Sequence, residues 1–582
     1  MKSLVFDIET DGLNPTEIYC LSVLDVDSKE QFNFNPSHVC EGIELLGSAD
    51  KLIGHNIIGF DIPVIKRLCG VNLLDKTLVD TLVLSRLFNP VRESHSLEAW
   101  GYKLQFPKIE FSDYSRFSED MMRYCAQDVI LNFKVYEALK RESKGFTLES
   151  VNLETDTYKI TCAQTAYGFM LDIDLVTQLI KDFEQELIDT EDEVHKTFKP
   201  KITKRTLYAQ HTKQGILKKL GVDDDGKQAR LTEEEYAYLS TGEEYLQRHI
   251  ETPFNLGSRD QIGQYLQDFG WKPKVFTPTG KPKVDEKTLS GVKDIPEAAL
   301  IAKYLMLQKR LAQVTSWKTF LNGNRVHGSV LSNGTITGRM SHRAPNLAQV
   351  PSVSVPYGKE CRACWTVPRG YSLVGIDASG LELRMLAHYL NDKEFINDIL
   401  NGDIHTANQN RAGLQSRSQA KTFIYAFLYG AGDAKIGSVV GGDKKAGRRI
   451  KQSFLSNFPS LKHLRNRITR EADERGFIKA LDGRKIFIRS SHAALNSLLQ
   501  SAGASVMNRA LIILNNALKE SNLDAHIVAN VHDEWQIETW TEDADDLGEL
   551  AVDAIRKAGD YYNLNCPLDG EYKIGRNWSE TH

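Results

Sequence analysis

Residues 417–430 read RSQAKTFIYAFLYG, and this stretch carries the most specific periodicity in the chain. Two cations and two tyrosines recur in it every four residues: Arg417, Lys421, Tyr425 and Tyr429. On a helix they form one gently drifting stripe, in which the neighbouring cations repel by roughly 0.2–0.5 kcal/mol unless an anion lies between them. The stripe therefore predicts a helix that binds a triphosphate, with a tyrosine that can stack on a base or sugar.

Two acidic residues flank this helix, each next to a predicted strand. Residues 371–376, YSLVGI, have the composition of a buried strand and lead directly to Asp377. Residues 527–537, IVANVHDEWQI, predict two strands joined by a tight turn that contains Asp533. An acid at a hairpin tip is often only a turn former, so neither residue is informative alone. With the cationic stripe between them, the two acids predict a metal-binding cluster of carboxylates.

A helix is also predicted directly after Asp377. Ser379 and Glu382 match the capping-box pattern S-x-x-E, in which two side chains satisfy the first backbone N–H groups of a helix. This pattern predicts a structural role for Glu382.

A second set of acids lies near the N-terminus. Asp7 and Glu9 are two residues apart on a predicted strand, so both side chains leave the same face. Asp61 ends the stretch GHNIIGFD, and Tyr124 and Asp128 are four residues apart on one predicted helix. Four converging acids repel one another, and two Mg²⁺ ions about 3.5–4 Å apart would resolve this and activate a water for attack on a phosphodiester. Tyr124 would orient or deprotonate that water.

The composition sets limits on the class of protein. A chain of 582 residues is too long for one hydrophobic core and should divide into three or four domains. No apolar run predicts a membrane span, and acids appear too early for a secretory signal. The eight scattered cysteines fit a reducing cytosol, and Cys361 and Cys364 lack the second pair that a zinc ribbon needs.

The charge distribution is more informative than the net charge of −5. Residues 195–220 contain eight Lys or Arg and no acid, and residues 444–451 contain five more. An isolated cluster of this kind is usually a solvated helix face. Two clusters beside acidic sites favour a polyanionic partner, because Lys and Arg contacts to phosphates supply most sequence-independent affinity.

The order of predicted elements separates the chain into regions. Residues 1–145 are expected to be α/β, with strands at 3–8, 18–26 and 52–57 and a helix at 121–139. Residues 150–320 are expected to be mostly helical, including an amphipathic run at 173–194. A reversal from basic to acidic charge predicts a surface insertion at about 196–252.

The C-terminal motifs resemble those of the family A DNA polymerases. Motif A corresponds to DASGLELR at 377–384, motif B to residues 417–430 and motif C to VHDE at 531–534. Shorter matching stretches are TGR at 337–339, PNLAQ at 345–349, GDIH at 402–405 and LLQ at 498–500. The forms of motifs A and B are most similar to the replicative polymerases of T7-like short-tailed phages.

The N-terminal motifs DIET, GHNIIGFD and YxxxD resemble the DEDD superfamily of 3′–5′ exonucleases, in the variety with Tyr in its last motif. Together the two resemblances imply a multidomain chain of α/β and α+β class. It would consist of an RNase H-like exonuclease domain followed by a right-hand polymerase with thumb, palm and fingers. The domains expected are the exonuclease at 1–145, the thumb at 146–340, the palm at 341–404 and 481–582, and the fingers at 405–480.

The resemblance also implies roles for individual residues. Asp377 and Asp533 would hold two Mg²⁺ ions per active site, helped by the carbonyl of Ala378, with Mn²⁺ as a substitute. The residues expected to bind the dNTP are His405, Arg417, Lys421, Tyr425 and Glu382. Lys421 would also be catalytic, and Glu382 would exclude the ribose 2′-hydroxyl. The residues expected at the primer-template are Arg339, Tyr429, Gln500, His532 and Glu534.

Two of these roles have specific consequences. Arg339 and Gln500 would read minor-groove acceptors, which are nearly independent of sequence and so report pairing geometry. Tyr425 stands where the family carries Phe or Tyr, and the tyrosine form tolerates a missing 3′-hydroxyl.

The phage relatives carry a thumb insertion that recruits thioredoxin. The segment at about 196–252 differs from it in charge pattern and could clamp duplex DNA, dock another processivity factor or be a solvated insertion.

The function expected is template-directed DNA synthesis with proofreading, in replication of a phage in the host cytoplasm. The partners expected are primer-template DNA and dNTPs, with a processivity factor, a helicase or a primase as further candidates, and no membrane. A gap-filling repair polymerase and a nuclease with an inactive polymerase scaffold are the alternatives. Single-subunit RNA polymerases share the palm, but the exonuclease motifs and Glu382 favour deoxynucleotides. Nothing requires more than a monomer.

Overall fold

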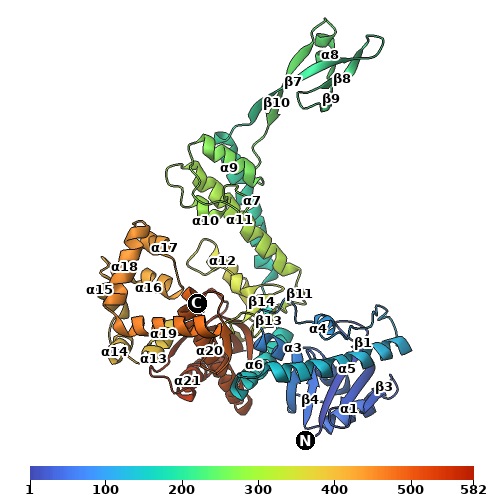
Figure 1. Cartoon of the computed structure of the whole chain (residues 1–582), viewed down its shortest axis with the longest axis vertical. Helices are drawn as coiled ribbons and strands as arrows, with labels where there is room; N and C mark the ends of the chain where they lie inside the picture. The colour runs from blue at the N-terminus through green and yellow to red at the C-terminus, as the bar shows by residue number, and fades with distance from the viewer. The chain divides into compact units, whose positions relative to one another are not determined.

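The computed structural model describes residues 1–582, which fold into two compact units (Figure 1). The first unit combines Met1–Asp172 with Phe320–His582, and the second is Ile173–Thr319. Helices and sheets are mixed along the whole chain, which confirms the expected fold class. None of the helices combines the length and the apolar character that crossing a membrane requires.

The N-terminal domain is built on a five-stranded sheet of order β3-β2-β1-β4-β5. Its strands are β1 (Ser3–Thr10), β2 (Ile18–Asp25), β3 (Gln31–Phe34), β4 (Lys51–Gly54) and β5 (Thr77–Asp80). On β1, Leu4, Phe6 and Ile8 pack in one core cluster, whereas Val5 packs against Val129 on the opposite face. Because side chains alternate along a strand, Asp7 and Glu9 share the face of Val5.

Helices on both faces of this sheet complete the N-terminal site. They are α1 (Val39–Gly47), α2 (Asp61–Cys69), α3 (Thr81–Phe88), α4 (Leu97–Lys103) and α5 (Glu119–Glu142). The side chain of Ser118 caps α5, and α2 begins at Asp61 itself, as predicted. The strand predicted at 52–57 is wrong at its end, because Asn56 adopts a φ of 66° and the chain turns there toward α2.

The segments expected to form the palm contain a four-stranded antiparallel sheet of order β19-β20-β16-β21. The strands are β16 (Tyr371–Ala378), β19 (Ala525–Val531), β20 (Glu534–Trp540) and β21 (Gly570–Gly575). Two long helices, α20 (Ala494–Glu520) and α21 (Ala544–Tyr561), pack together and share one large core with the sheet. The turn of the β19–β20 hairpin lies at 532–533, where His532 adopts a φ of 61°.

The helix after motif A, α13 (Leu381–Leu390), does not have the predicted capping box. Its N-cap is Gly380, with a φ of 59° and no side-chain hydrogen bond. The left-handed backbone at Gly380 starts the helix one residue after the predicted cap of Ser379, which therefore cannot reach the first turn in the capping geometry. This leaves the Glu382 carboxylate free for other contacts.

The segment expected to form the fingers, at 405–480, is helical. Its helices are α15 (Ile404–Ala412), α16 (Arg417–Leu428), α17 (Asp433–Val439), α18 (Lys444–Ser456) and α19 (Pro459–Arg475), and α14 (Lys393–Leu400) comes just before them. The side chain of Ser416 caps α16, and Phe423, Ile424 and Phe427 bury its other face in the common core. This burial orients the predicted cationic stripe away from the core, with Tyr429 as the C-cap residue.

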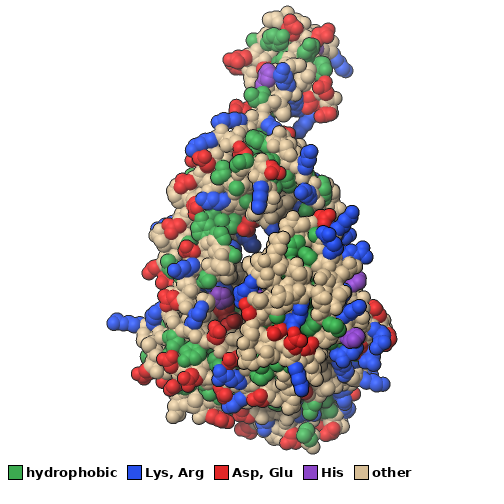
Figure 2. All heavy atoms as spheres, turned by 90° about the vertical axis from the view of Figure 1, so that its left-hand side faces the viewer, with side chains coloured by type: hydrophobic (Ala, Val, Ile, Leu, Met, Phe, Trp, Pro, Cys, Tyr) green, Lys and Arg blue, Asp and Glu red, His purple; other side chains and the backbone are tan.

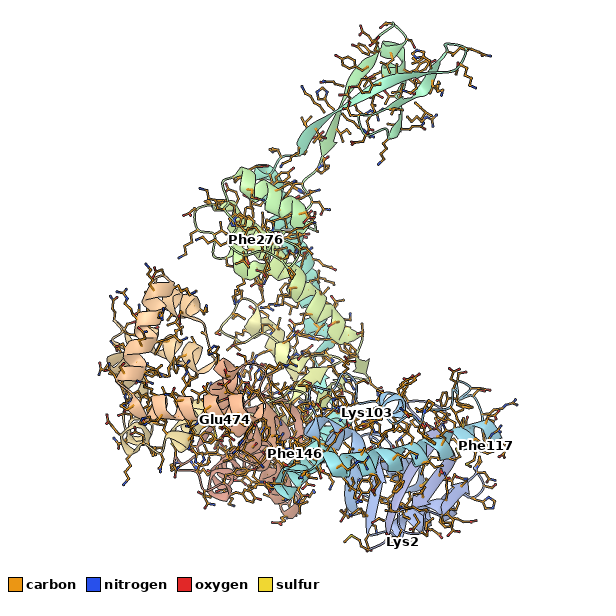
Figure 3. The ribbon with its side chains drawn as sticks, in the orientation of Figure 1. Lys2, Lys103, Phe117, Phe146, Phe276 and Glu474 are labelled. Carbon is orange, nitrogen blue, oxygen red and sulfur yellow. The ribbon has the colours of Figure 1, made fainter.

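Helix α6 (Leu148–Tyr167) belongs to the first unit, where it joins the N-terminal domain to the palm. The thumb was expected to begin at residue 146, whereas the second unit begins only after α6, at Ile173. Its buried Glu154 pairs with Arg484, which also pairs with Asp482, each at 2.6 Å. At the end of α5, Phe146, labelled in Figure 3, packs against Phe88 with ring centroids 4.9 Å apart, and Lys485 lies over its ring.

The second unit contains four helices and a separate β module. The helices are α7 (Ile173–Thr197), α9 (Arg259–Asp268), α10 (Glu286–Leu289) and α11 (Glu297–Lys318). The mostly helical expectation is wrong for residues 201–252. They form β7 (Lys201–His211), β8 (Leu217–Val222), β9 (Gln228–Arg230) and β10 (Tyr245–Thr252), with one short helix, α8 (Glu233–Leu239). Four leucines between the sheet and α8 form the small core of the module. Lys201, Lys204, Lys218 and Lys219 of the basic cluster therefore lie on strands and not on a helix face.

Replacing Arg484 with Met should destabilise the contact between α6 and the palm strongly. The change leaves Glu154 and Asp482 buried without their cation, so the free energy of unfolding should fall by about 3–5 kcal/mol in urea-unfolding measurements. Arg475→Met is the matched control, because Arg475 is 57% exposed in its pair with Glu471, and it should change stability by less than about 0.5 kcal/mol. Equal effects of the two substitutions would contradict this role.

Candidate active sites

The four N-terminal acids converge between β1, α2 and α5. Glu9, Asp61 and Asp128 are buried, and the backbone N–H of Ile8 donates to Asp61 at 3.2 Å. Burial and then repulsion from Asp61, Glu9 and Asp128 raise the pKa of Asp7 well above its ordinary value. Burial and repulsion from Asp128 raise the pKa of Glu9 to about 8. The sequence predicts that these four acids converge. Their mutual repulsion, seen in the raised pKa values, means that they lie close together in the fold.

This acid cluster fits divalent cations. The donor atoms of Asp7, Glu9 and Cys125 all lie within 4.8 Å of one another. One carboxylate oxygen of Asp128, Oδ1, is buried without a hydrogen-bond partner. Hard cations prefer carboxylate oxygens, and a cation here would satisfy this oxygen and reduce the repulsion. Asp7, Glu9, Asp61 and Asp128 are the residues that would hold it.

Lys108 is a member of this site that the sequence did not indicate. Its ammonium pairs with Asp128 at 2.6 Å and lies 4.7 Å from the centre of the Tyr124 ring. Tyr124 is one helical turn before Asp128 on α5, and its ring stacks on Phe111 at 5.4 Å. Burial and the charge of Asp128 raise the pKa of Tyr124, which keeps its hydroxyl protonated. Lys108 lies in an irregular segment with no motif, so only the fold could reveal it.

A cavity of about 1020 Å³ lies beside the loop that leads to Asp61. Residues of that loop, of α2, α3 and α6 and of the polymerase half all line it, including Asn56, Tyr158 and Leu331. Its charged lining residues are all cations: Lys66, Arg67, Arg86, Lys159 and Arg343. Arg86 is partly buried without an ion pair or a hydrogen bond, and burial lowers its pKa. Such a cavity suits a phosphorylated ligand.

The two C-terminal acids meet at one end of the palm sheet. Asp377 is directly opposite Glu534 in the β16–β20 pair, and the N–H of Ala378 donates to the carbonyl of Asp533 at 3.1 Å. Desolvation by the surrounding palm, and then repulsion from Asp533, raise the pKa of Asp377 to about 7, although its side chain reaches solvent. Burial and then repulsion from Glu382 raise the pKa of Asp533. This donor set also fits divalent cations.

Glu382 connects the palm to the fingers. Its Oε1 accepts hydrogen bonds from the hydroxyl of Tyr429 at 2.8 Å and from Arg339 at 3.2 Å. Burial and then this contact raise the pKa of Tyr429 to about 12. Tyr425 is half-buried, and burial and then the charges of Glu382, Asp533 and Asp377 raise its pKa. The stripe on α16 therefore meets the palm acids through its two tyrosines.

The cationic end of the stripe already has an anion. Arg417 pairs with Asp403 at 2.6 Å, and the same carboxylate caps α15. A triphosphate was expected from the sequence to offset the repulsion between Arg417 and Lys421, and in this structure Asp403 already supplies an anion to Arg417. Lys421 is exposed without an ion pair, and His405 Nδ1 is buried without a hydrogen bond. Burial and then the nearby Arg417 and Lys421 lower the pKa of His405.

The residues expected at the primer-template differ in accessibility. His532 is exposed at the hairpin, and Gln500 is partly exposed on α20. Glu534 is instead buried, where it accepts hydrogen bonds from Trp578 and Gln536 and pairs with His582 at 2.9 Å. A direct contact of Glu534 with DNA is therefore wrong. The alternation of β20 turns this side chain to the opposite face from Asp533 and toward the C-terminus.

Comparison with known proteins identifies the two halves of the chain. A sequence model described as DNA polymerase family A matches residues 227–580, and one described as the RNase H superfamily matches residues 4–106. The chain belongs to DNA polymerase family A. Its N-terminal domain is RNase H-like, as the exonuclease motifs predicted. Proteins of these two families generally act through divalent metals, in agreement with both acidic clusters.

Two phage proteins match this family A chain over its whole length. The DNA-directed DNA polymerases of Enterobacteria phage T3 and Escherichia phage T7 are each 34% identical to it, with 100% of both chains covered. DNA polymerase I of Pseudomonas aeruginosa is 29% identical over 362 residues, which cover 56% of this chain and 39% of that protein. The predicted resemblance to T7-like phage polymerases is confirmed.

A solved structure supports the fold. The polymerase domain of Pol1 from M. smegmatis, in complex with primer-template DNA and dNTP, matches with a TM-score of 0.78. The match covers 100% of this chain and 96% of that chain at 17% sequence identity.

Without divalent cations, this family A protein should lose stability as pH rises from about 5 to 8. The pKa of Glu9 is about 8 in the folded chain against an ordinary 4.5, so at intermediate pH the folded state binds a proton that the unfolded state has lost. The stabilisation is complete below the lower value and is lost as pH approaches the higher one. Melting temperatures in EDTA should therefore fall with pH, and Mg²⁺ should reverse the loss.

Two variants test the assignment of this effect to the acid cluster. Glu9→Gln cannot ionise and should flatten the melting profile in EDTA. Glu44→Gln changes an exposed glutamate of α1 without an ion pair and should keep the wild-type slope. A wild-type profile that rises over this pH range would contradict the explanation.

Proposed function

We propose that the chain is a template-directed DNA polymerase that extends a primer with dNTPs and removes mispaired 3′ ends with its exonuclease domain. One observation carries the proposal: Asp377 and Asp533 lie together at one end of the palm sheet, opposite α16. The hydroxyl of Tyr425 lies in the field of both acids, and Lys421 is one turn earlier on the same helix. A nucleotide bound there would meet the two acids on one side and the Lys421 cation on the other.

The residues of the polymerase site would divide the work between charge and position. Asp377, Asp533 and the carbonyl of Ala378 would hold two Mg²⁺ ions. When bound, such ions lower the pKa of the primer 3′-hydroxyl and neutralise charge on the leaving pyrophosphate. Lys421 and His405 would bind phosphate oxygens. Arg417 would exchange Asp403 for the triphosphate, since phosphate offers it a bidentate partner of higher charge.

Sugar selection would depend on Glu382. Tyr429 and Arg339 hold its carboxylate in place, so it cannot swing away from the incoming sugar without breaking two hydrogen bonds. A ribose 2′-hydroxyl would meet this fixed carboxylate and the Tyr425 ring. Arg339 would contact the minor groove of the primer end, with Gln500 beside it on α20.

The N-terminal site would hydrolyse the primer end. Tyr124, whose ring stacks on Phe111, would orient the attacking water with its protonated hydroxyl. Lys108 neutralises part of the charge on Asp128 and would favour the approach of a phosphodiester. The cationic cavity lined by Arg86, Tyr158 and Arg343 would carry the single-stranded end toward Asp61.

A replicative role in a phage is supported by the full-length similarity to the polymerases of phages T3 and T7. A repair polymerase is the second candidate. The partial similarity of this chain to a bacterial DNA polymerase I favours a repair role. A nuclease with an inactive polymerase half is disfavoured, because Asp377, Asp533 and Lys421 are all in position.

A labelled primer on a longer template tests both activities. With Mg²⁺ and dNTPs the wild type should extend the primer, and without nucleotides it should shorten it. Asp377→Ala should abolish extension by at least about 1,000-fold and leave shortening intact, because it removes a metal ligand of one site only. Asp7→Ala should have the reverse effect. Extension that persists in Asp377→Ala, or shortening that persists in Asp7→Ala, would contradict the assignment.

Tyr425→Phe should make the enzyme discriminate against dideoxynucleotides. The phenolic hydroxyl lies near the palm acids and can replace the missing 3′-hydroxyl of the nucleotide, whereas the phenyl ring cannot. Relative termination by ddNTP over dNTP should fall by at least about 100-fold, with dNTP extension little changed. Tyr102→Phe is the matched control, because Tyr102 is exposed on α4 outside this site. Equal termination by wild type and Tyr425→Phe would refute this role.

A further inference from the structure

The β module of residues 201–252 has one sheet face covered and one open. The covered face carries Leu207 and Leu246, which pack with Leu239 of α8 and with Leu231. In the β7–β10 register Leu207 is opposite Leu246 and Tyr208 is opposite Tyr245. Because side chains alternate, the two tyrosines and their neighbours at every second position lie on the open face.

Aromatic and aliphatic side chains form the middle of this open face. Tyr208 and Tyr245 are 41% and 51% exposed, and their ring centroids are 6.1 Å apart. The hydroxyl of Tyr208 donates to Asp224 at 2.9 Å, which orients its ring. Leu220 on β8 is also exposed, and Val222 is opposite Tyr208. These rings lie outside the leucine core of the module and present their faces to the solvent.

The open face of the module carries cations and acids together. Its cations, Lys204, Lys218 and Arg230, make no ion pair or hydrogen bond through their side chains. Its acids are Glu251, on β10, and Asp224, which accepts the hydrogen bond from Tyr208. By contrast, residues 231–247 contain five glutamates and no Lys or Arg, and they include helix α8 on the covered side. Figure 2 shows cationic, acidic and hydrophobic side chains together on the visible side of the module.

We propose that the open face of the β7–β10 sheet binds single-stranded DNA. Bases of a single strand expose their faces and can stack on Tyr208 and Tyr245, whereas a duplex conceals them. Lys204, Lys218 and Arg230 surround the rings and would contact the backbone phosphates, while the glutamates of the opposite side repel the strand and set its orientation. The inference goes beyond the proposed polymerase and exonuclease reactions and does not depend on either.

Binding of a fluorescein-labelled oligo-dT of about 12 nucleotides to the full chain in EDTA tests the proposal by anisotropy. Tyr208→Ala with Tyr245→Ala should weaken binding by about tenfold or more, because each ring supports a stacked base. Tyr208→Phe with Tyr245→Phe keeps both rings and should bind within about twofold of wild type. Tyr238→Ala is the matched control, because Tyr238 is 50% exposed on α8 and should have no effect.

Two further measurements localise the strand. The combined substitution Lys204→Gln, Lys218→Gln and Arg230→Gln should lower the slope of log affinity against log salt by about 2, from three lost phosphate contacts. A bromodeoxyuridine-substituted oligonucleotide should photo-crosslink to peptides that contain Tyr208 or Tyr245. Unchanged binding by the double alanine variant, an equal loss for duplex DNA or for Tyr238→Ala, or crosslinks confined to the first unit would overturn the proposal.

Discussion

Repulsion between carboxylates is the constraint on which both candidate active sites depend. The sheet of the N-terminal domain and the sheet of the palm each bring acids to one sheet end, where burial makes their negative charge costly. The raised pKa of Glu9 and that of Asp377 are consequences of this crowding. The protein tolerates the cost because divalent cations can take the place of protons. Each site is therefore stable in a form that is also prepared for phosphoryl chemistry.

The two sites differ in how the surrounding fold completes them. The N-terminal acids come from β1, α2 and α5 of one small domain, and Lys108 already neutralises part of their charge. The palm acids lie on neighbouring strands, and their cationic counterpart is on a separate helix of the fingers. Glu382 connects the two elements through its contact with Tyr429. Asp403 holds Arg417 at the other end of the helix.

Much of this arrangement could be predicted because local periodicity limits where side chains point. The alternation along β1 placed Asp7 and Glu9 on one face, and the four-residue spacing placed Tyr124 with Asp128. Local patterns failed where the backbone took an unusual conformation. Gly380 shifted the start of α13 and removed the predicted cap of Ser379. The lysine-rich insertion was expected among helices, yet it forms the strands β7, β8 and β10.

The sequence by itself determined the family, the two sets of acids and the cationic helix, because these depend on residue identity and on short spacings. Only the tertiary structure decided which other groups share the sites. Lys108 reaches Asp128 from a segment without a motif, and Asp403 at the start of α15 reaches Arg417 at the start of α16. Glu534, next to Asp533 in sequence, lies buried among residues of the C-terminus. Such contacts join residues far apart in the chain or on opposite strand faces, and only the packing of whole elements brings them together.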